Sequence, residues 1–294
     1  MDVSVVVPFY RRHDNLERCL AGLSLQEGAS FEVLVCAFRP DARLEAICRA
    51  HPCVRVEPVG GEDWNVSRSR NAGLRAAAGD LVLFLDADVV ARPELLALHR
   101  AWQADGHARG DAQCVTAGRV LGFAPYESEP AAALEVLRRS VPELLAGAEA
   151  LLESDPRWQL AARPLPWALC WSGNLSVPRR WALERKLFFD PGFQGWGGED
   201  LEWAYRACRS GCRVELCPEA WGVHLPHPRP VSAMVASERE NFRRFLRAHP
   251  SFEVEIVVWL NDLEANRRFD SLVQEIAAAR GLPPADAVRS LRLA

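Results

Sequence analysis

Apolar positions in the first 85 residues follow two alternating patterns. Short, mostly β-branched runs predict buried strands at Val3–Pro8, Phe31–Cys36, Val54–Glu57 and Leu81–Leu85. Between them, apolar residues recur at helical spacing, which predicts helices over Asn15–Leu25, Arg43–Ala50 and Ser67–Ala78, the last closed by Gly79. Strand and helix in alternation predict an α/β fold with a parallel, doubly wound sheet and helices on both faces.

Two later regions depart from this pattern. The stretch 124–166 is rich in Ala, Glu, Leu and Pro, with two short helical patterns, and we interpret it as a lid or insertion. From Val231 the chain is helical and charged, apart from the apolar run Val254–Leu260. We therefore expect a catalytic domain over 1–230 and a mainly helical appendage over 231–294. The appendage could serve a partner, a second copy in a homodimer, or a membrane surface.

Composition narrows the function classes. The 294 residues carry a formal net charge of −4, which argues against broad nucleic-acid binding. The nine cysteines show no metal-ligand spacing and several lie in apolar runs, so we expect reduced, structural thiols. No signal peptide is evident, and the apolar runs fall short of the ~20 residues that span a bilayer. These features predict a cytoplasmic protein without a transmembrane segment, able to associate peripherally with the inner face of the membrane.

A pair of acids directly follows the fourth predicted strand. Asp86 and Asp88 stand two residues apart, and ligands of open α/β sheets bind at the carboxyl ends of strands. Carboxylates so placed can hold a divalent cation that also contacts substrate phosphates. An ordinary surface turn with two acids is the alternative, but the buried strand before them favours a metal site.

A glycine-rich segment with acids and a tryptophan follows at Gly195–Arg206. Its glycines allow close approach to a ligand, and Glu199 and Asp200 would open a helix. Helix-capping acids are the plain interpretation, yet capping does not require the preceding Gly-Trp-Gly-Gly. An aromatic ring beside carboxylates is typical of sugar binding. Further on, His224 and His227 could be structural histidines or could complete the metal site, where imidazole suits manganese better than magnesium.

Five segments in order carry a resemblance to a known family. They are Val5–Tyr10, Ser67–Gly73, Leu85–Asp88, Trp171–Arg179 and Gly195–Asp200. Together they resemble family 2 glycosyltransferases of the GT-A fold, which has a Rossmann-like, mixed but mainly parallel sheet. The Gly-Trp-Gly-Gly-Glu-Asp stretch resembles the galactosyltransferase C-terminal motif of β-1,4-galactosyltransferases and bacterial chondroitin-type synthases. The resemblance covers about residues 3 to 228.

The resemblance implies roles for the donor side of a site. The nucleoside would lie against Pro8, Tyr10 and Arg11, and Arg70 would reach the nucleotide. Asp88 would bind the metal, manganese in preference to magnesium, while Asp86 would hold ribose or donor hydroxyls and assist with the metal. His224 would complete the metal shell, with His227 as a further candidate.

The acceptor side is implied in the same way. Asp200 would be the catalytic base and Glu199 its hydroxyl-binding partner. Residues that would contact acceptor or donor sugar are Trp171, Asn174, Trp196, Gly197 and Gly198, with Trp167 as a further wall of the pocket. The acceptor could be a glycan, a lipid-linked sugar, a peptide or a small molecule.

The expected enzyme is thus an inverting, metal-dependent hexosyltransferase of bacterial type that uses a nucleotide-sugar, a UDP-sugar. One departure bears on the base: the second strand ends at Cys36, where the family usually has an aspartate that contacts uracil. The competing hypotheses are a retaining transferase of the same fold and a catalytically silent nucleotide-sugar-binding scaffold. A nucleotidyltransferase is disfavoured, because Phe-Tyr-Arg-Arg follows Pro8 in place of a glycine-rich phosphate loop with a lysine.

Overall fold

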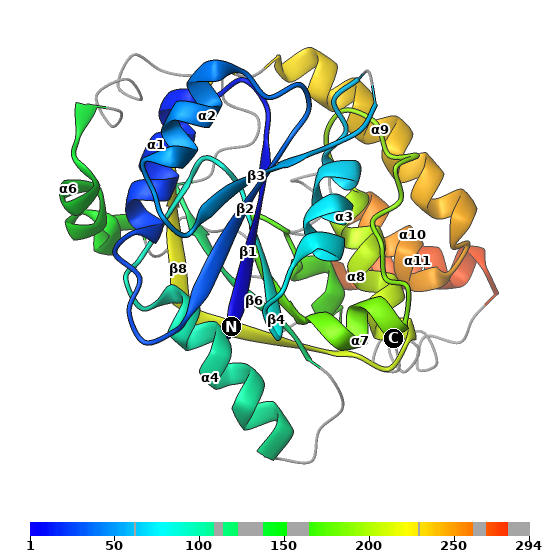
Figure 1. Ribbon diagram of the computed structural model, residues 1–294. Coiled ribbons are helices and arrows are strands. Elements are labelled where there is room, and N and C mark those ends of the chain that lie inside the picture. Colours follow the sequence, from blue (N-terminus) through cyan, green and yellow to red (C-terminus); the bar gives the residue numbers. More distant parts are fainter. Residues whose placement is uncertain are drawn as a thin grey trace.

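The computed structural model describes residues 1–61, 63–108, 114–122, 138–151, 165–228, 230–260 and 269–281. Its centre is an eight-stranded sheet in the order β3-β2-β1-β4-β7-β6-β8-β5. Helices cover both faces of this sheet (Figure 1). The mixed α/β architecture confirms the predicted fold class.

The N-terminal half of the sheet is parallel. It comprises β1 (Val3–Phe9), β2 (Phe31–Ala37), β3 (Val54–Pro58) and β4 (Leu81–Leu85). The helices between them are α1 (His13–Leu23), α2 (Ala42–Arg49) and α3 (Val66–Ala76). All seven elements were predicted, and their carboxyl-terminal strand ends lie at one edge of the sheet.

Two predicted boundaries are wrong for physical reasons. Strand β1 continues one residue past Pro8, because Phe9 still pairs with Ala37 of β2. Helix α3 ends at Ala76, and Ala77 already has extended ψ, so Gly79 does not close the helix. Gly79 is instead packed so tightly against β1 that a Cβ would come within 2.6 Å of the Ser4 backbone nitrogen.

The C-terminal half of the sheet is mixed. Strands β7 (Asn174–Pro178) and β6 (Cys114–Leu121) run antiparallel to their neighbours β4 and β7, and β8 (Arg213–His224) runs parallel to β6. The short β5 (Val89–Ala91) closes the edge antiparallel to β8. The register between β6 and β8 shifts after Gly118, so that Arg119 lies opposite Trp221.

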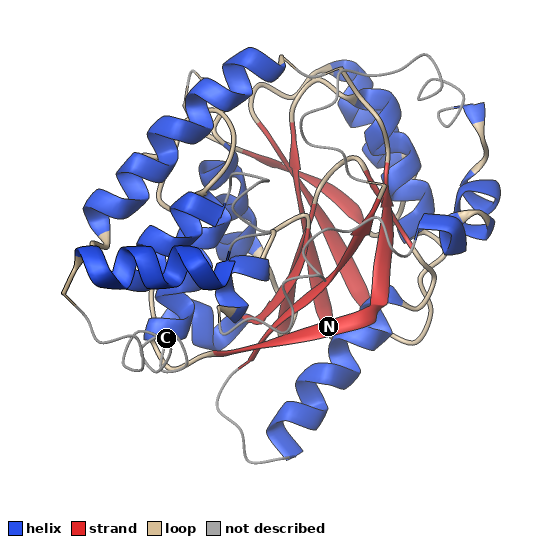
Figure 2. Cartoon of the chain, turned by 180° about the vertical axis from the view of Figure 1, so that it is seen from behind, coloured by secondary structure: helices blue, strands red, loops and turns tan. Residues whose placement is uncertain are grey.

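Each face of the sheet has its own hydrophobic core. On one face, residues of α1, α2 and α4 (Leu95–Ala108) pack on Val3, Val5 and Val7. On the other face, α3, the 3-10 turn η3 (Pro166–Leu169), α7 (Arg179–Glu184) and α8 (Glu199–Arg209) pack around Val6, Phe84 and Trp203. Figure 2 shows this layering from behind.

The C-terminal helices belong to the second core. They are α9 (Val231–Ala248), α10 (Phe252–Leu260) and α11 (Phe269–Ala279). Phe245, Val254 and Ile256 are fully buried in the same cluster as Trp203 of α8. The apolar run expected at 254–260 therefore lies in a helix whose residues Val254, Ile256 and Val257 are buried in this core.

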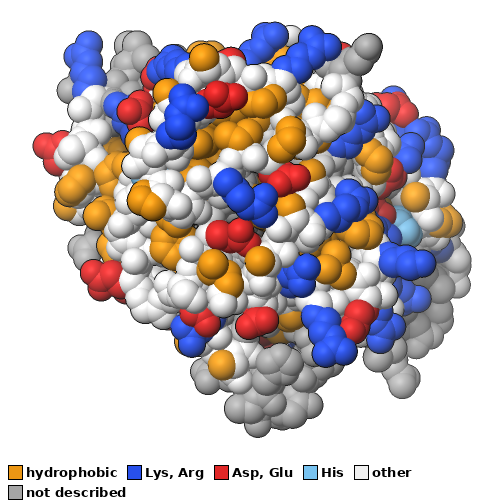
Figure 3. Space-filling model, viewed as in Figure 1, with side chains coloured by type: hydrophobic (Ala, Val, Ile, Leu, Met, Phe, Trp, Pro, Cys, Tyr) orange, Lys and Arg blue, Asp and Glu red, His pale blue; other side chains and the backbone are white. Residues whose placement is uncertain are grey.

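Other expectations concern the lid, the cysteines and the membrane. Within 124–166 the structure describes α6 (Val141–Ala146) and η1 (Ala148–Leu151), and most of the remainder lies outside the described residues. All nine cysteines are free thiols. Among the described helices, none has the length and apolar character needed to cross a membrane. Acidic and basic side chains are interspersed over the described surface in Figure 3.

Candidate active site

Sheet topology brings the two predicted acids and a histidine together. Asp86 directly follows β4, and Asp88 directly precedes β5. In the β5–β8 pairing Val89 lies opposite His224, and the Leu225 amide donates to the Asp88 carbonyl at 2.6 Å. The register of this edge strand therefore fixes His224 beside Asp88, although 136 positions separate them in the sequence.

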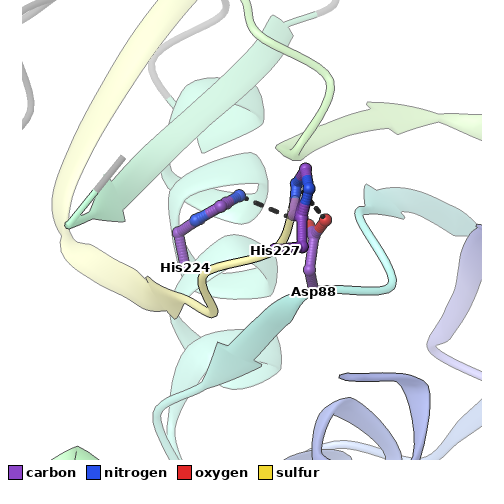
Figure 4. A group of neighbouring side chains, drawn as sticks. All are labelled: Asp88, His224 and His227. Atoms are coloured by element: carbon purple, nitrogen blue, oxygen red, sulfur yellow. Dashed lines mark ion pairs between the residues drawn. The ribbon is translucent and has the colours of Figure 1, made fainter. Parts of the chain in front are cut away.

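Three side chains form a group with metal-ligand chemistry (Figure 4). One atom each of Asp88, His224 and His227 lies within 4.8 Å of the others. Nε2 of His227 is 3.2 Å from Asp88 Oδ2, and Nε2 of His224 is 3.7 Å from Oδ1. All three side chains are at most 9% exposed. One carboxylate and two imidazoles are side chains that can hold a divalent metal ion.

The Asp86 carboxylate is not part of this group and lies next to Arg70. Arg70 Nη2 is 3.2 Å from Asp86 Oδ1, and Arg70 Nη1 is 2.8 Å from Glu199 Oε1. Arg70 projects from α3 and is only 4% exposed. A buried guanidinium thus joins the end of β4 to the start of α8, and it keeps both carboxylates compensated.

Arg12 is a site residue that the sequence analysis missed. Its guanidinium forms an ion pair with Asp88. The residue before it, Arg11, has a left-handed φ of 61°, which turns the chain at the end of β1. Burial alone would raise the pKa of Asp88, but His224, His227 and Arg12 together hold that pKa well below its usual value. Asp88 is therefore ionised.

Asp200 lies at the first turn of α8, behind a loop of unusual backbone. Gly195, Gly197 and Gly198 all have φ between 71° and 89°, the left-handed region that glycine adopts without strain. The backbone N–H groups of Ser172 and Leu201 donate to the Asp200 carboxylate at 3.3 and 2.9 Å. Burial, followed by the charge of Glu199, raises the pKa of Asp200 to about 7. A carboxyl group poised there can accept a proton near neutral pH.

Strand β7 explains how Asp200 comes to face the end of β4. Asn174 opens β7 opposite Leu85, so residues 171–173 run beside Asp86. The Asp86 N–H donates to the Gly173 carbonyl at 3.3 Å, and the neighbouring Ser172 N–H reaches Asp200. The predicted convergence of Asp86, Asp88, Asp200 and His224 thus results from two antiparallel strands added to the parallel sheet.

Aromatic side chains gather at the carboxyl ends of β1 and β2. Tyr10 is 41% exposed and stacks on Trp64, with ring centroids 5.0 Å apart, and Arg11 lies over the Tyr10 ring. Phe38 meets the edge of Trp64 at 5.7 Å. The sequence analysis named Tyr10 and Arg11 but missed Trp64 and Phe38. Their only signal was an aromatic residue soon after each of two strand ends.

Two expectations about the nucleoside end differ in detail. Pro8 is buried within β1, in register with Cys36. Burial raises the pKa of the Cys36 thiol to about 12, so it stays neutral and offers no charge to a base. The exposed part of this end of the sheet is consequently built from aromatic rings and arginine.

Two residues expected to line the sugar pocket, Asn174 and Trp167, lie instead in the interior. Asn174 is fully buried: its Nδ2 donates to the carbonyls of Arg119 and Ala220, and its Oδ1 meets His99 at 2.9 Å. These carbonyls flank the register shift between β6 and β8, so the amide satisfies groups that the ladder leaves unpaired. Trp167 is likewise fully buried, against Tyr205 and Phe245. Trp171 is half-buried and packs on the same core.

The chain is similar to known glycosyltransferases. Residues 4–123 match the family described as Glycosyl transferase family 2. Validoxylamine A glucosyltransferase of Streptomyces hygroscopicus subsp. limoneus is 31% identical over 273 residues, which cover 86% of this chain and 58% of that protein. Chondroitin synthase of Escherichia coli is 27% identical over 253 residues, covering 77% and 35% of the two chains. The chain therefore spans about three-fifths or less of the length of these relatives.

Solved structures show the same fold. Staphylococcus aureus TarS 1–349 in complex with UDP has a TM-score of 0.56 at 16% identity, covering 99% of this chain and 90% of that one. Mannosyltransferase PcManGT from Pyrobaculum calidifontis, in complex with GDP-Man and Mn²⁺, has a TM-score of 0.57 at 20% identity, covering 98% and 78%. Residues 4–123 thus match the model of family 2 glycosyltransferases, and the chain has the GT-A fold.

Proposed function

We propose that this protein transfers a sugar from a UDP-sugar to an acceptor hydroxyl, with a divalent metal and with inversion at the anomeric carbon. The observation that carries the proposal is the link made by Arg70. On one side of it stands Asp86, two residues from the Asp88–His224–His227 group; on the other stands Glu199, next to Asp200. Ligands for a cation and a proton acceptor thus share one site.

The donor side would hold the nucleotide. Asp88, His224 and His227 would hold the metal. When bound, the metal would neutralise the negative charge of the diphosphate leaving group. Tyr10 and Trp64 present an aromatic stack on which a base could lie. TarS was solved with UDP and with UDP-GlcNAc, and PcManGT with GDP-Man and Mn²⁺. Those ligands support a nucleotide-sugar donor here, and uracil is the base we propose.

The acceptor side would supply the base. Asp200 accepts the proton of the acceptor hydroxyl, and its raised pKa makes it a stronger base than an ordinary carboxylate. Glu199, held by Arg70, would accept a hydrogen bond from a sugar hydroxyl, and Trp196, three residues earlier in the chain, would offer its half-buried ring. A base that activates the attacking hydroxyl directly, with no covalent sugar intermediate, corresponds to inversion.

A donor screen tests the proposal. The purified chain, with Mn²⁺ and a panel of UDP- and GDP-sugars, is assayed for release of nucleoside diphosphate with glycan, lipid-linked and small-molecule acceptors. We expect turnover with a UDP-sugar that is lost in excess EDTA and in Asp200→Asn. Product configuration is read by NMR. Failure to bind any nucleotide in the presence of Mn²⁺ would remove the proposed activity, whereas a retained configuration would remove inversion alone.

A further inference from the structure

The segment Asp190–Gly198 leads into Glu199 and Asp200 without regular secondary structure. Three of its glycines are left-handed, so no ladder of backbone hydrogen bonds runs along it. Several of its carbonyls and N–H groups are satisfied by side chains from outside the segment. Asn65, at the start of α3, donates to the carbonyls of Pro191 and Phe193 at 3.1 and 3.0 Å. The conformation of this loop is therefore set by its neighbours.

One face of helix α9 contacts the same loop. Ser237, Asn241 and Arg244 are spaced by four and three residues, so they project from one side of the helix. Ser237 Oγ accepts from the Trp196 N–H at 3.1 Å. Arg244 binds the Asp190 carboxylate at 2.7 Å. The contacts of α9 thus run along the loop from its first residue to the glycines before α8.

Asn241 makes the densest set of these contacts. Its Oδ1 accepts from the Gln194 N–H at 3.2 Å, and its Nδ2 donates to the carbonyls of Gln194, Trp196 and Gly197 at 2.9, 3.2 and 2.8 Å. The side chain is only 4% exposed. Because one end accepts from an N–H and the other faces carbonyls, a single amide orientation satisfies the loop.

The packing leaves the loop little room to move. A Cβ on Gly197 would lie 3.3 Å from Cγ of Glu238 on α9, and one on Gly195 would lie 2.7 Å from Cβ of Ser237. The loop backbone therefore lies directly against the helix. Any shift of α9 or loss of its amide would move Trp196 and the first turn of α8, where Asp200 lies.

We propose that Asn241 is a positioning residue for transfer: through the Gln194–Gly197 backbone it fixes the loop that presents Trp196 and Asp200 to the acceptor. The inference rests on the proposed function for the roles of Trp196 and Asp200. It makes α9, outside the 4–123 family match, part of the acceptor half of the site. The four hydrogen bonds described for Asn241 all go to the loop, so we expect the donor half, at Asp88, His224 and Tyr10, to keep its geometry when Asn241 is replaced.

The test uses Asn241→Asp, which keeps size and shape but replaces two donors by a charge that faces carbonyls. Arg243→Ala is the matched control, since the Arg243 side chain lies on the same helix, is 69% exposed and forms an ion pair with Glu240, one helical turn away. For folded Asn241→Asp we expect kcat to fall roughly 10- to 100-fold and acceptor KM to rise, as small misplacements do. UDP affinity with Mn²⁺ should stay within about twofold of the parent. Arg243→Ala should match the parent.

Hydrogen exchange over residues 194–201 gives a readout that does not depend on activity. Exchange there should rise in Asn241→Asp and stay unchanged in Arg243→Ala. Ser237→Ala, which removes one contact, provides the milder variant if Asn241→Asp does not fold, and should show the same changes in smaller degree. Normal kcat with unchanged exchange would overturn the proposal, as would a fall in UDP affinity equal to the fall in kcat. A parent protein that turns over no donor would refute the proposed function. Faster hydrogen exchange of the loop in Asn241→Asp would still support the role of Asn241 in holding the loop.

Discussion

Replacing Asp200 by Asn should slow catalysis and yet stabilise the fold at alkaline pH. The pKa of Asp200 is raised from its ordinary value of 3.8 to about 7, because burial and the charge of Glu199 oppose ionisation more than Arg70 favours it. A folded-state pKa above the unfolded one means that stability is full below about pH 4 and is lost as pH rises through 7. Three pKa units correspond to about 4 kcal/mol at most.

The substitution Asp200→Asn changes two contributions to the free energy of unfolding. Asn has one carbonyl oxygen, so either the Ser172 or the Leu201 N–H loses its acceptor, at about 1 kcal/mol. The cost of the buried charge disappears. We therefore expect Asp200→Asn to be more stable than the parent by about 1–3 kcal/mol at pH 9 and no more stable at pH 5. Turnover should fall by ~10²–10⁴, as for a positioned general base.

Urea unfolding at pH 5, 7 and 9 measures the difference in stability between Asp200→Asn and the parent. Initial rates with saturating donor measure the loss of turnover. In the parent, log kcat/KM should rise by about one per pH unit up to roughly pH 7 and then level off. Glu199→Gln should shift the rising part of this pH profile to lower pH, since Glu199 helps to raise the Asp200 pKa. Near-normal turnover in Asp200→Asn, or a stability difference that does not change with pH, would refute the assignment of the base.

Three further predictions concern other parts of the molecule. Asp88→Ala and His227→Ala should each weaken Mn²⁺ binding at least tenfold, measured by electron paramagnetic resonance of free Mn²⁺; unchanged binding in both would contradict the ligand group. Trp64→Ala should weaken UDP binding roughly 5- to 50-fold in calorimetry, because the stack under Tyr10 is lost; equal affinity would place the base elsewhere. Truncation after Pro230 should give an unfolded chain by circular dichroism, since α9–α10 supply several fully buried side chains at about 1.5–3 kcal/mol each; a folded, active truncation would show that the C-terminal helices are dispensable.

Local sequence patterns predicted the parallel half of the fold well. Strands β1, β2 and β4 are short and largely buried, β3 is a partly exposed edge strand, and amphipathic helices separate them, so each can be found without knowing its neighbours. The position of Asp86 and Asp88 at a strand end followed from the same reasoning. The glycine-rich segment and the histidine pair also singled out Asp200 and His224 as candidates, and family resemblance then supplied the roles expected of them.

The remaining features depend on pairings between distant residues. His227 lies closer to Asp88 than His224 does, a consequence of the turn after β8 that spacing does not encode. Asn174 was expected at the sugar, but the register shift between β6 and β8 leaves carbonyls that its amide satisfies. Asn241 lay in a presumed appendage, and only the packing of α9 on the Gly195–Gly198 loop gives it a role.

Arg70 illustrates how the charges of this site constrain one another. It was expected at the nucleotide, yet it is 4% exposed, both of its terminal nitrogens bind carboxylates, and its Nε is buried without a partner in the described part of the chain. A guanidinium so enclosed is placed to compensate Asp86 and Glu199, because either carboxylate left unpaired in this position would be costly. Arg12, by contrast, is 45% exposed and reaches Asp88 from the surface. We therefore expect the buried cation to maintain the architecture that links the proposed donor and acceptor sides, and the exposed one to be accessible to an incoming diphosphate.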